Sequence, residues 1–287
     1  MISLPTRIER AGFRLRYRLA DLTYAVGIAT PKRGVAGTYW SYEPTDPHGD
    51  DPGLAALEAL PADATIVDAG AHVGEHAIPL ALDTDRHVIA FEPNGESADR
   101  LARNARRNGL RVTGGDPASG GGSADAIDLR RAGLGDATAT LSFYRSTFSK
   151  LSAFDRDRAT RWGAEVAAVE SVPILRLDDI VRESDGEDGA TGKEPAGDDL
   201  ADAVPPPDAI KVDVEGHEAA VLRGAARTIA TYRPLLVIEV HDEAGDRDGD
   251  TQSGGESPRP SERDLREWLV ERGYTVEPAE DVWICRG

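Results

Sequence analysis

The feature that most constrains this chain is a repeated alternation of short apolar runs with amphipathic segments. Runs such as ATIVDAGA (64–71) and HVIAFEPN (87–94) have the length of buried strands, whereas ESADRLARNARRNGL (96–110) has helical spacing. The same order returns at 208–231, where DAIKVDVEG precedes a second helical segment. Strands that alternate with helices indicate a mostly parallel sheet covered on both faces, so we expect a doubly wound α/β fold.

Further segments complete this pattern. We expect additional strands at 125–134, 138–144, from 172, at 234–241 and in the last fourteen or so residues, and additional helices at 75–82, 217–231 and 261–273. Three stretches interrupt the pattern because they are rich in Gly, Ser, Pro and Asp and poor in large apolar residues: 113–125, 183–207 and 242–260. We therefore expect one domain over 53–287 with three acidic insertions, preceded by an N-terminal extension over 1–52.

The charge of the chain excludes some classes of partner. A formal net charge of -18 argues against general affinity for nucleic acid, which needs clustered Lys and Arg. Four lysines accompany 29 arginines, and we interpret the acidic surface as suited to high salt, where counterions screen self-repulsion. An ordinary acidic protein with disordered loops is the alternative.

Cellular location is inferred from three absences in the sequence. The chain has no apolar run of 18 residues and no signal-peptide pattern, and the lone Cys285 cannot form an internal disulfide. We therefore expect a cytoplasmic protein.

Charged residues stand at the ends of four predicted strands. In a doubly wound sheet, ligands bind beyond the carboxyl ends of the strands, near the point where strand order reverses. We therefore expect the ligand cleft at these strand ends: Asp68, Glu92, Asp213 with Glu215, and Glu239 with His241.

The first strand end, VDAGAHVGEHA, indicates the class of ligand. Gly70 and Gly74 allow a sharp turn and a close approach to a ligand, but the G-x-G-x-x-G pattern of dinucleotide sites is absent. Asp68 would repel a pyrophosphate. S-adenosylmethionine carries an ammonium and a sulfonium and no phosphate, so this turn favours it. Glu92, 24 residues further on, stands where an acidic side chain can accept hydrogen bonds from both ribose hydroxyls.

The chain resembles the FkbM family of S-adenosylmethionine-dependent methyltransferases. The segments that carry the resemblance are, in order, VDAGAHVGEHA, AFEPN, RLARNARRNGL, LRLDDIV, IKVDVEGHEAAVLRGA and RPLLVIEVH. The resemblance implies the class I methyltransferase fold, which is Rossmann-like, with S-adenosyl-L-methionine as cofactor. Where the family's glycine turn usually carries Asn, this chain has His72, so the role of that side chain is an open question.

The resemblance also implies which residues surround the cofactor. Asp68, Gly70 and Gly74, with the intervening turn, would surround the methionine part and Glu92 the ribose. Contacts to adenine are expected after the third strand. The expected cofactor residues are Asp68, Gly70, Ala71, His72, Val73, Gly74, Glu92, Pro93, Ala132 and Asp136.

Candidate catalytic residues lie within and after the strand predicted at 208–216, and His241 ends the strand predicted at 234–241. Lys211, Asp213 and Glu215 alternate with apolar residues, so their side chains should share one face of the sheet. We hypothesise that Asp213 lies beside the sulfonium or the acceptor hydroxyl, that Glu215 and His241 are candidate bases, and that Lys211 orients a carboxylate. The alternative is structural: a Lys211–Asp213 ion pair, with Glu215 favouring a helix N-terminus.

Several functions remain open at this level. The favoured one is O-methylation of a hydroxyl on a sugar of a glycan, a glycolipid or a secondary metabolite, the acceptor being implied by the resemblance. A non-catalytic S-adenosylmethionine-binding or assembly protein is the alternative, and a NAD-dependent oxidoreductase is less favoured. We expect no metal, because nothing in the spacing of the acidic residues and His241 is diagnostic of Mg²⁺ or Mn²⁺.

The N-terminal stretch 7–27 is basic and aromatic, unlike the acidic remainder. It could lie on a membrane surface, cover the acceptor cleft, or form a helix docked on its own domain. The sequence leaves the oligomeric state open.

Overall fold

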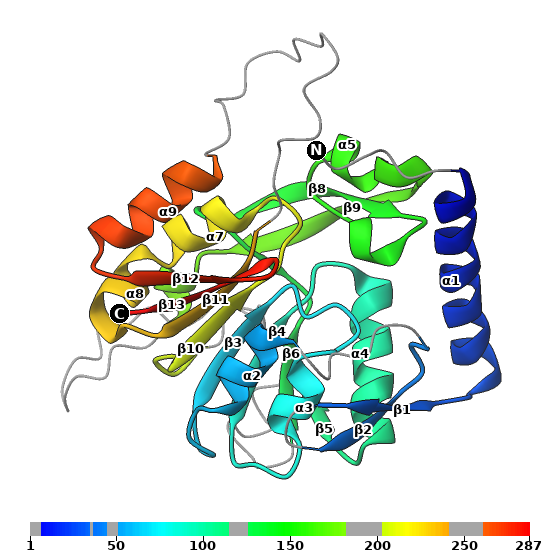
Figure 1. Ribbon diagram of the computed structural model, residues 1–287, viewed down its shortest axis with the longest axis horizontal. Helices are drawn as coiled ribbons and strands as arrows, with labels where there is room; N and C mark the ends of the chain where they lie inside the picture. The colour runs from blue at the N-terminus through cyan, green and yellow to red at the C-terminus, as the bar shows by residue number, and fades with distance from the viewer. Residues whose placement is uncertain (1–6, 35–36, 45–50, 115–125, 182–202, 241–260) are drawn as a thin grey trace, which may run out of the picture.

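A computed structural model of the chain describes residues 7–34, 37–44, 51–114, 126–181, 203–240 and 261–287. Its centre is an eight-stranded sheet with the order β12-β13-β11-β10-β3-β4-β6-β5 (Figure 1). The strands are β3 (Thr65–Ala69), β4 (His87–Phe91), β5 (Arg111–Thr113), β6 (Ala126–Arg130), β10 (Ala209–Val212), β11 (Leu235–Glu239), β12 (Thr275–Ala279) and β13 (Val282–Arg286). In this sheet β11, β10, β3, β4, β6 and β5 pair in parallel, and β13 is antiparallel to both of its neighbours, β11 and β12.

Helices cover both faces of this sheet. One apolar cluster joins the sheet to α2, α3 and α4, and another joins it to α6, α7, α8 and α9. The helices are α2 (Pro52–Glu58), α3 (Ala77–Ala81), α4 (Gly95–Arg107), α6 (Leu177–Ile180), α7 (Glu218–Gly224), α8 (Ala226–Tyr232) and α9 (Glu262–Glu271). The single helix expected at 217–231 is thus two helices, which meet at Ala225.

The strand order reverses between β3 and β10. On one side of β3 lie β4, β6 and the edge strand β5. The chain later returns to place β10 and β11 on the other side. This is the doubly wound arrangement that the sequence predicted. The carboxyl ends of β3, β4 and β10 therefore meet at one edge of the sheet, where a ligand cleft is expected.

A second, three-stranded sheet lies at this end of the molecule. It has the order β7-β9-β8, with β7 (Gly133–Leu134), β8 (Ala139–Ser146) and β9 (Val166–Leu175) (Figure 1). Three short helical segments lie between β8 and β9: the 3₁₀ turn η2 (Ser149–Leu151), the helix α5 (Arg156–Ala159) and the 3₁₀ turn η3 (Arg161–Gly163). The predicted strands at 138–144 and from 172 thus exist, but they pair with each other outside the main sheet. Exposed residues dominate the first half of β8 and alternate along β9, which suits a sheet with one solvated face.

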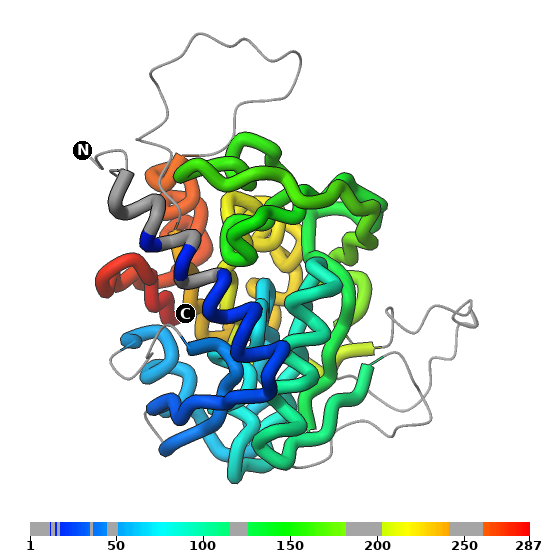
Figure 2. The backbone as a smooth tube through the Cα atoms, turned by 90° about the vertical axis from the view of Figure 1, so that its right-hand side faces the viewer, coloured from blue at the N-terminus to red at the C-terminus, as the bar shows by residue number. Residues whose placement is uncertain are grey.

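The N-terminal segment packs along the outer side of α4. It contains α1 (Arg7–Val26) and the hairpin of β1 (Thr30–Arg33) and β2 (Thr38–Ser41). Asn104 of α4 accepts a hydrogen bond from the Tyr42 backbone (3.0 Å) and donates to the Tyr24 hydroxyl (2.8 Å). Figure 2 shows α1 as the outermost element on this side. None of the described helices is long and apolar enough to cross a membrane.

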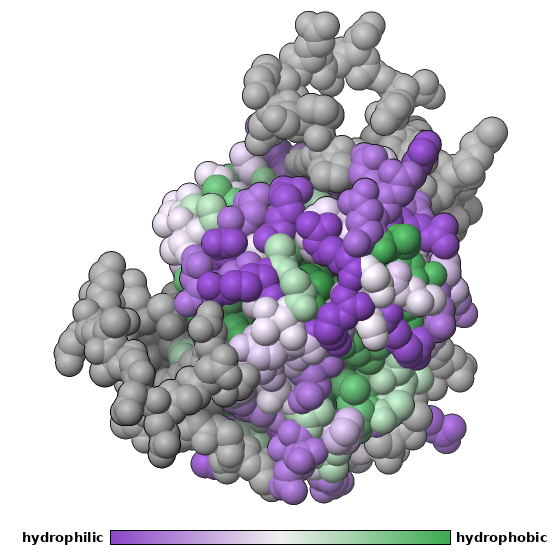
Figure 3. Space-filling view, turned by 90° about the vertical axis from the view of Figure 1, so that its left-hand side faces the viewer, coloured by the Kyte–Doolittle hydropathy of each residue, from purple (hydrophilic) through white to green (hydrophobic). Residues whose placement is uncertain are grey.

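Polar residues dominate the surface, and one predicted insertion contributes to the core. On the face that Figure 3 shows, hydrophilic residues prevail and hydrophobic ones are scattered. Val204, within the stretch 183–207, is fully buried, and its N–H donates to the Ile180 carbonyl (2.7 Å). The apolar side chain at that position is the physical reason that residues 203–207 join the packed fold. Most of the three predicted insertions lies outside the described residues.

Candidate functional site

The turn after β3 is held against its neighbours by backbone contacts. The N–H groups of Gly70 and Ala71 donate to the Phe91 carbonyl at 2.9 and 3.1 Å. Gly70 has a φ of 82°, and a Cβ placed on it would lie 1.8 Å from the Asp213 carbonyl oxygen. Only glycine fits there, because the turns after β3 and β10 touch at this point.

Glu92 lies at the end of β4 with its carboxylate buried. One oxygen accepts from the His72 N–H (2.7 Å) and the other from the Asn94 N–H (2.8 Å). Burial raises the pKa of Glu92 to about 7, although the two backbone donors act in the opposite direction. A buried carboxylate with further acceptor capacity suits a ligand that donates two hydroxyl groups.

Lys211 joins the two central turns. Its Nζ lies 3.0 Å from Asp68 Oδ1 and 3.6 Å from Asp213 Oδ2, and it donates to the Gly70 carbonyl (2.9 Å). Burial alone would lower the pKa of Lys211, but the Asp68 and Asp213 carboxylates outweigh burial and raise it. Lys211 is therefore a cation under the site. The predicted contact with Asp213 is present, and the closer contact with Asp68 was not predicted.

These residues border a cavity of about 390 Å³, which we call the switch-point cavity. Of the predicted residues, those that line it are Gly70, Ala71, His72, Glu92, Pro93, Lys211, Asp213 and Glu215. Asp68, Val73 and Gly74 are not among the lining residues, and Asp68 and Val73 are almost completely buried. His241 lies outside the described residues.

The two residues expected near adenine do not reach the switch-point cavity. Ala132 is fully buried in the core, and Asp136 forms an ion pair with Arg223 (2.9 Å) on the surface. Their neighbours Gly133 and Leu134, which form β7, line the cavity instead. The pairing of β7 with β9 turns this segment away from the main sheet, which position in the sequence alone did not reveal.

Glu215 does not continue the strand alternation that the sequence suggested. Strand β10 ends at Val212, and Glu215 follows with a left-handed φ of 48°. Its carboxylate accepts from Arg161 of η3 at 2.7 Å. The prediction that Glu215 continues the strand alternation is therefore wrong, because the backbone turns before it. Its side chain still lines the switch-point cavity together with those of Lys211 and Asp213.

His72 also has a left-handed backbone, and its ring is uncharged at neutral pH. Burial lowers its pKa to about 4, with Glu75 opposing the shift. Its Nε2 lies 3.1 Å from the Ser149 hydroxyl of η2, which also lines the cavity. The His72 side chain thus connects the glycine turn to η2 in the wall of the switch-point cavity.

Sequence reasoning missed a His–Asp pair in the cavity wall. His76 Nε2 lies 2.8 Å from Asp51 Oδ2, and both residues line the cavity. Asp51 caps α2 by accepting from Gly53 and Leu54, and the Asp-Pro-Gly sequence signals such a helix start. Nothing in the spacing, however, signals that residue 51 meets residue 76. Among the residues that the structure describes, no group of three or more His, Cys, Asp or Glu side chains is arranged to hold a metal ion.

Comparisons with known proteins indicate the family of the chain. A family model described as the methyltransferase FkbM domain matches residues 68–276. Hexuronic acid methyltransferase AglP of Haloferax volcanii is 28% identical over 187 residues, which are 64% of this chain and 59% of that protein. The chain thus spans about three fifths of the length of this curated relative.

Solved structures resemble the chain more distantly. Methyltransferase FkbM from Methylobacillus flagellatus is 18% identical, with a TM-score of 0.45 over 80% of this chain and 45% of that one. TYW2 of P. horikoshii, in complex with MeSAdo, is 12% identical, with a TM-score of 0.33 over 94% of this chain and 80% of that one. The family match spans most of the sequence, from the end of β3 to β12, and includes both central turns, Glu92 and Lys211. The chain therefore belongs to the FkbM methyltransferase family.

Proposed function

We propose that this protein transfers a methyl group from S-adenosylmethionine to a hydroxyl of a sugar acceptor. The observation that carries the proposal is Glu92, a buried carboxylate at the end of β4 that faces the cavity beside a glycine turn without room for a side chain at Gly70. That combination suits a nucleoside whose ribose donates two hydroxyl groups. Membership of the FkbM family supports the same ligand class.

The lining of the switch-point cavity suits a cationic ligand. Glu92 and Asp213 face the cavity together with Glu239, and Lys211 is already paired with carboxylates beneath it. We propose that Gly70, Ala71 and Asp213 hold the methionine part, Glu92 the ribose, and Pro93 with Leu134 the base. When bound, S-adenosylmethionine supplies an electrophilic methyl carbon, and the protein's task is to align an acceptor oxygen with it.

A base that takes the acceptor's proton would contribute about 10²- to 10⁴-fold to the rate. Asp213, Glu215 and His241 remain our proposals from the sequence. His76 joins them, since Asp51 holds its ring at the cavity wall and a carboxylate partner fixes the orientation of an imidazole. Glu215 is the weakest of the four, because Arg161 already occupies its carboxylate.

The acceptor class comes from the relative. AglP of Haloferax volcanii is named a hexuronic acid methyltransferase. We propose that the acceptor here is likewise a sugar acid, free or within a glycan or glycolipid, and that the reaction takes place in the cytoplasm. A non-catalytic S-adenosylmethionine-binding or assembly protein is the alternative, and turnover of any sugar acid excludes it.

We also propose that α1 touches a membrane surface. Leu15, Leu19, Leu22 and Val26 recur at helical spacing and are 45 to 69% exposed, so they form an apolar stripe on the outer side. Co-sedimentation with anionic vesicles tests this: Leu19→Asp should abolish binding, whereas Val169→Asp, at an exposed apolar residue on β9, should not. Equal binding by both variants would contradict it.

Calorimetric titration with S-adenosylmethionine in molar KCl tests the proposed cofactor. Glu92→Ala should weaken binding about 10- to 100-fold, because a charged acceptor of two hydrogen bonds is lost. Glu271→Ala, an exposed glutamate on α9, is the matched control and should bind normally. NADH should not bind. A folded protein that binds NADH, or that binds S-adenosylmethionine equally with and without Glu92, would refute the proposal.

A further inference from the structure

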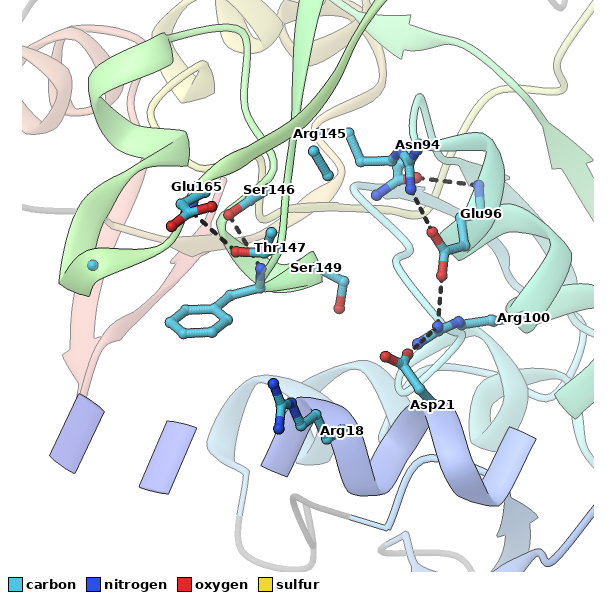
Figure 4. Close-up of a pocket in the computed structure, with 13 residues that line it drawn as sticks. Arg18, Asp21, Asn94, Glu96, Arg100, Arg145, Ser146, Thr147, Ser149 and Glu165 are labelled. Carbon is cyan, nitrogen blue, oxygen red and sulfur yellow. Dashed lines mark hydrogen bonds and ion pairs between the residues drawn. The ribbon is translucent and has the colours of Figure 1, made fainter. Parts of the chain in front are cut away.

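A second cavity lies beside the switch-point cavity. Its volume is about 510 Å³, and it is enclosed by α1, the first turns of α4, and the β8 and β9 side of the small sheet. We call it the α1 pocket. Figure 4 shows Arg18 of α1 on one side, Arg100 of α4 and its N-cap residue Asn94 on another, and Thr147 and Glu165 opposite. Its size lies within the range of about 300 to 1,000 Å³ that small-molecule sites occupy.

The wall between the two cavities is thin. Ser149 of η2 lines both of them. Asn94 lines the α1 pocket directly after Pro93, which lines the switch-point cavity, and its amide donates to the hydroxyl of Ser152 (3.3 Å) in that cavity's wall. A molecule in the α1 pocket would therefore sit next to whatever the switch-point cavity holds.

A chain of ion pairs fixes one side of the α1 pocket. Arg100 donates to Asp21 and to Glu96, at 2.6 Å in both cases. Arg145 donates to the other oxygen of Glu96 (2.7 Å) and to Glu170 (3.1 Å). Such a network holds donors and acceptors in place before a ligand arrives, which lowers the entropy lost on binding.

Arg18 stands apart from this network. It is exposed, it lines the pocket, and no ion pair joins it to any other residue that the structure describes. Hydroxyl groups of Thr147 and Ser149 lie in the same lining. A guanidinium that forms no ion pair with the described residues, beside hydroxyls and ordered carboxylates, suits a polyhydroxylated anion, since its planar fork matches a carboxylate.

We propose that the α1 pocket binds a second, carboxylate-bearing sugar unit of the acceptor, with Arg18 on its carboxylate. The acceptor is then an acidic oligosaccharide rather than a free sugar, with one unit in the switch-point cavity and the next beyond Ser149. This inference rests on the proposed function in that the unit in the switch-point cavity is the one to be methylated.

Titration calorimetry with galacturonic acid, trigalacturonic acid and its methyl-esterified form tests the proposal, each in molar KCl with S-adenosylhomocysteine present. The trimer should bind at least about tenfold more tightly than the single sugar. Arg18→Ala should weaken binding of the trimer about 10- to 100-fold and leave the affinity for the single sugar unchanged. Arg18→Lys should recover only part, since the fork is lost. Arg263→Ala, an exposed arginine of α9, is the matched control.

Each outcome decides between readings. If the trimer binds no more tightly than the single sugar, or if Arg18→Ala behaves like Arg263→Ala, the proposed subsite is wrong. If the methyl-esterified trimer binds as well as the acid, the assignment of Arg18 to a carboxylate is wrong. If S-adenosylhomocysteine fails to bind while trigalacturonic acid binds through Arg18, the proposed methyl transfer fails and the acidic-sugar site stands.

Discussion

The two turns that meet at the centre of the sheet have similar backbones but different supports. His72, after β3, and Glu215, after β10, both have a φ of 48°. The turn after β3 is held by backbone donors to Phe91 in the adjacent strand. The turn after β10 also has a backbone contact to its neighbouring strand, from the Asp213 N–H to the Ala69 carbonyl (3.0 Å). In addition, its Glu215 accepts from Arg161 of η3, which is 54 residues away in the sequence. The comparison shows that two turns of the same local conformation can be stabilised by different contacts. Contacts to an adjacent strand can be predicted from the sequence, whereas an ion pair with a distant segment cannot.

The largest effect should come from the residue that joins the two turns. Lys211→Met leaves Asp68 buried without its cation, which should reduce the free energy of unfolding by about 3 to 5 kcal/mol. Urea denaturation in molar KCl measures the loss. The double variant Lys211→Met with Asp68→Asn should recover much of it, because no charge is then left buried. A single variant as stable as wild type would mean that the two turns are held independently.

The next effect tests how tightly the turns touch. Gly70→Ala places a Cβ against the Asp213 carbonyl and should cost roughly 2 to 3 kcal/mol, besides weakening S-adenosylmethionine binding. Gly109 is the matched control. It also has a positive φ, of 80°, but its Cβ would meet nothing within 4 Å, so Gly109→Ala should cost only about 1 kcal/mol. Equal losses in the two variants would show that conformation, not contact, governs the turn after β3.

The pH dependence of the free energy of unfolding should show that His72, in the turn after β3, is buried. The folded-state pKa of His72, about 4, lies below the ordinary value of 6.5, so its contribution to stability is present above pH 6.5 and is lost as pH falls toward 4. His72→Asn removes this loss and keeps a residue that tolerates a left-handed backbone. From pH 8 to pH 5 the variant should gain roughly 1 to 2 kcal/mol relative to wild type.

The difference between this variant and wild type separates the effect of His72 on stability from that of Glu92. Glu92 has a raised pKa, so its contribution to stability is lost as pH rises from about 4.5 to 7, the opposite direction. Both proteins retain that trend, and it cancels in the difference. A difference that does not change with pH would place His72 in contact with solvent.

The smallest effect should come from the distant support. Arg161→Ala breaks the ion pair with Glu215, in which both side chains are about one-fifth exposed, and should cost about 1 kcal/mol. A double-mutant cycle with Glu215→Gln measures the coupling, and calorimetry should find the affinity for S-adenosylmethionine changed by less than about twofold. A large loss of cofactor affinity would make the turn after β10 as important for the cofactor as the turn after β3.

The parts of the fold that depend on neighbours in sequence were predictable. The strand ends at Asp68, Glu92 and Asp213 and the tight turn at Gly70 follow from apolar runs and from glycine chemistry, and all lie together as expected. The pairing of β8 with β9 in a separate sheet, by contrast, depends on which strands meet in space.

The same limit applies to the site. Position alone suggested Ala132 and Asp136, but the turn into β7 brings Gly133 and Leu134 to the cavity instead. The contact of His76 with Asp51 depends on how α2 and α3 pack on the sheet, and no spacing rule encodes it. Long-range packing, rather than local propensity, therefore limits what the sequence reveals about this site.

The small sheet has a consequence for how specificity can change in this family. Strands β7, β8 and β9 and the segments between them come from one continuous stretch, residues 133–175, and among the described strands none of them pairs with the main sheet. This stretch contributes Ser149, Thr147 and Glu165 to the α1 pocket, whereas the turns after β3 and β10 belong to the main sheet. On the assignments proposed above, exchange of residues 135–175 between relatives would replace much of the wall around the acceptor. It would leave in place Leu134, proposed to contact the base, and the turns after β3 and β10, proposed to hold the methionine part. If these assignments hold, relatives can differ in the acceptor they recognise through changes in this one stretch of chain while they keep the same methyl donor.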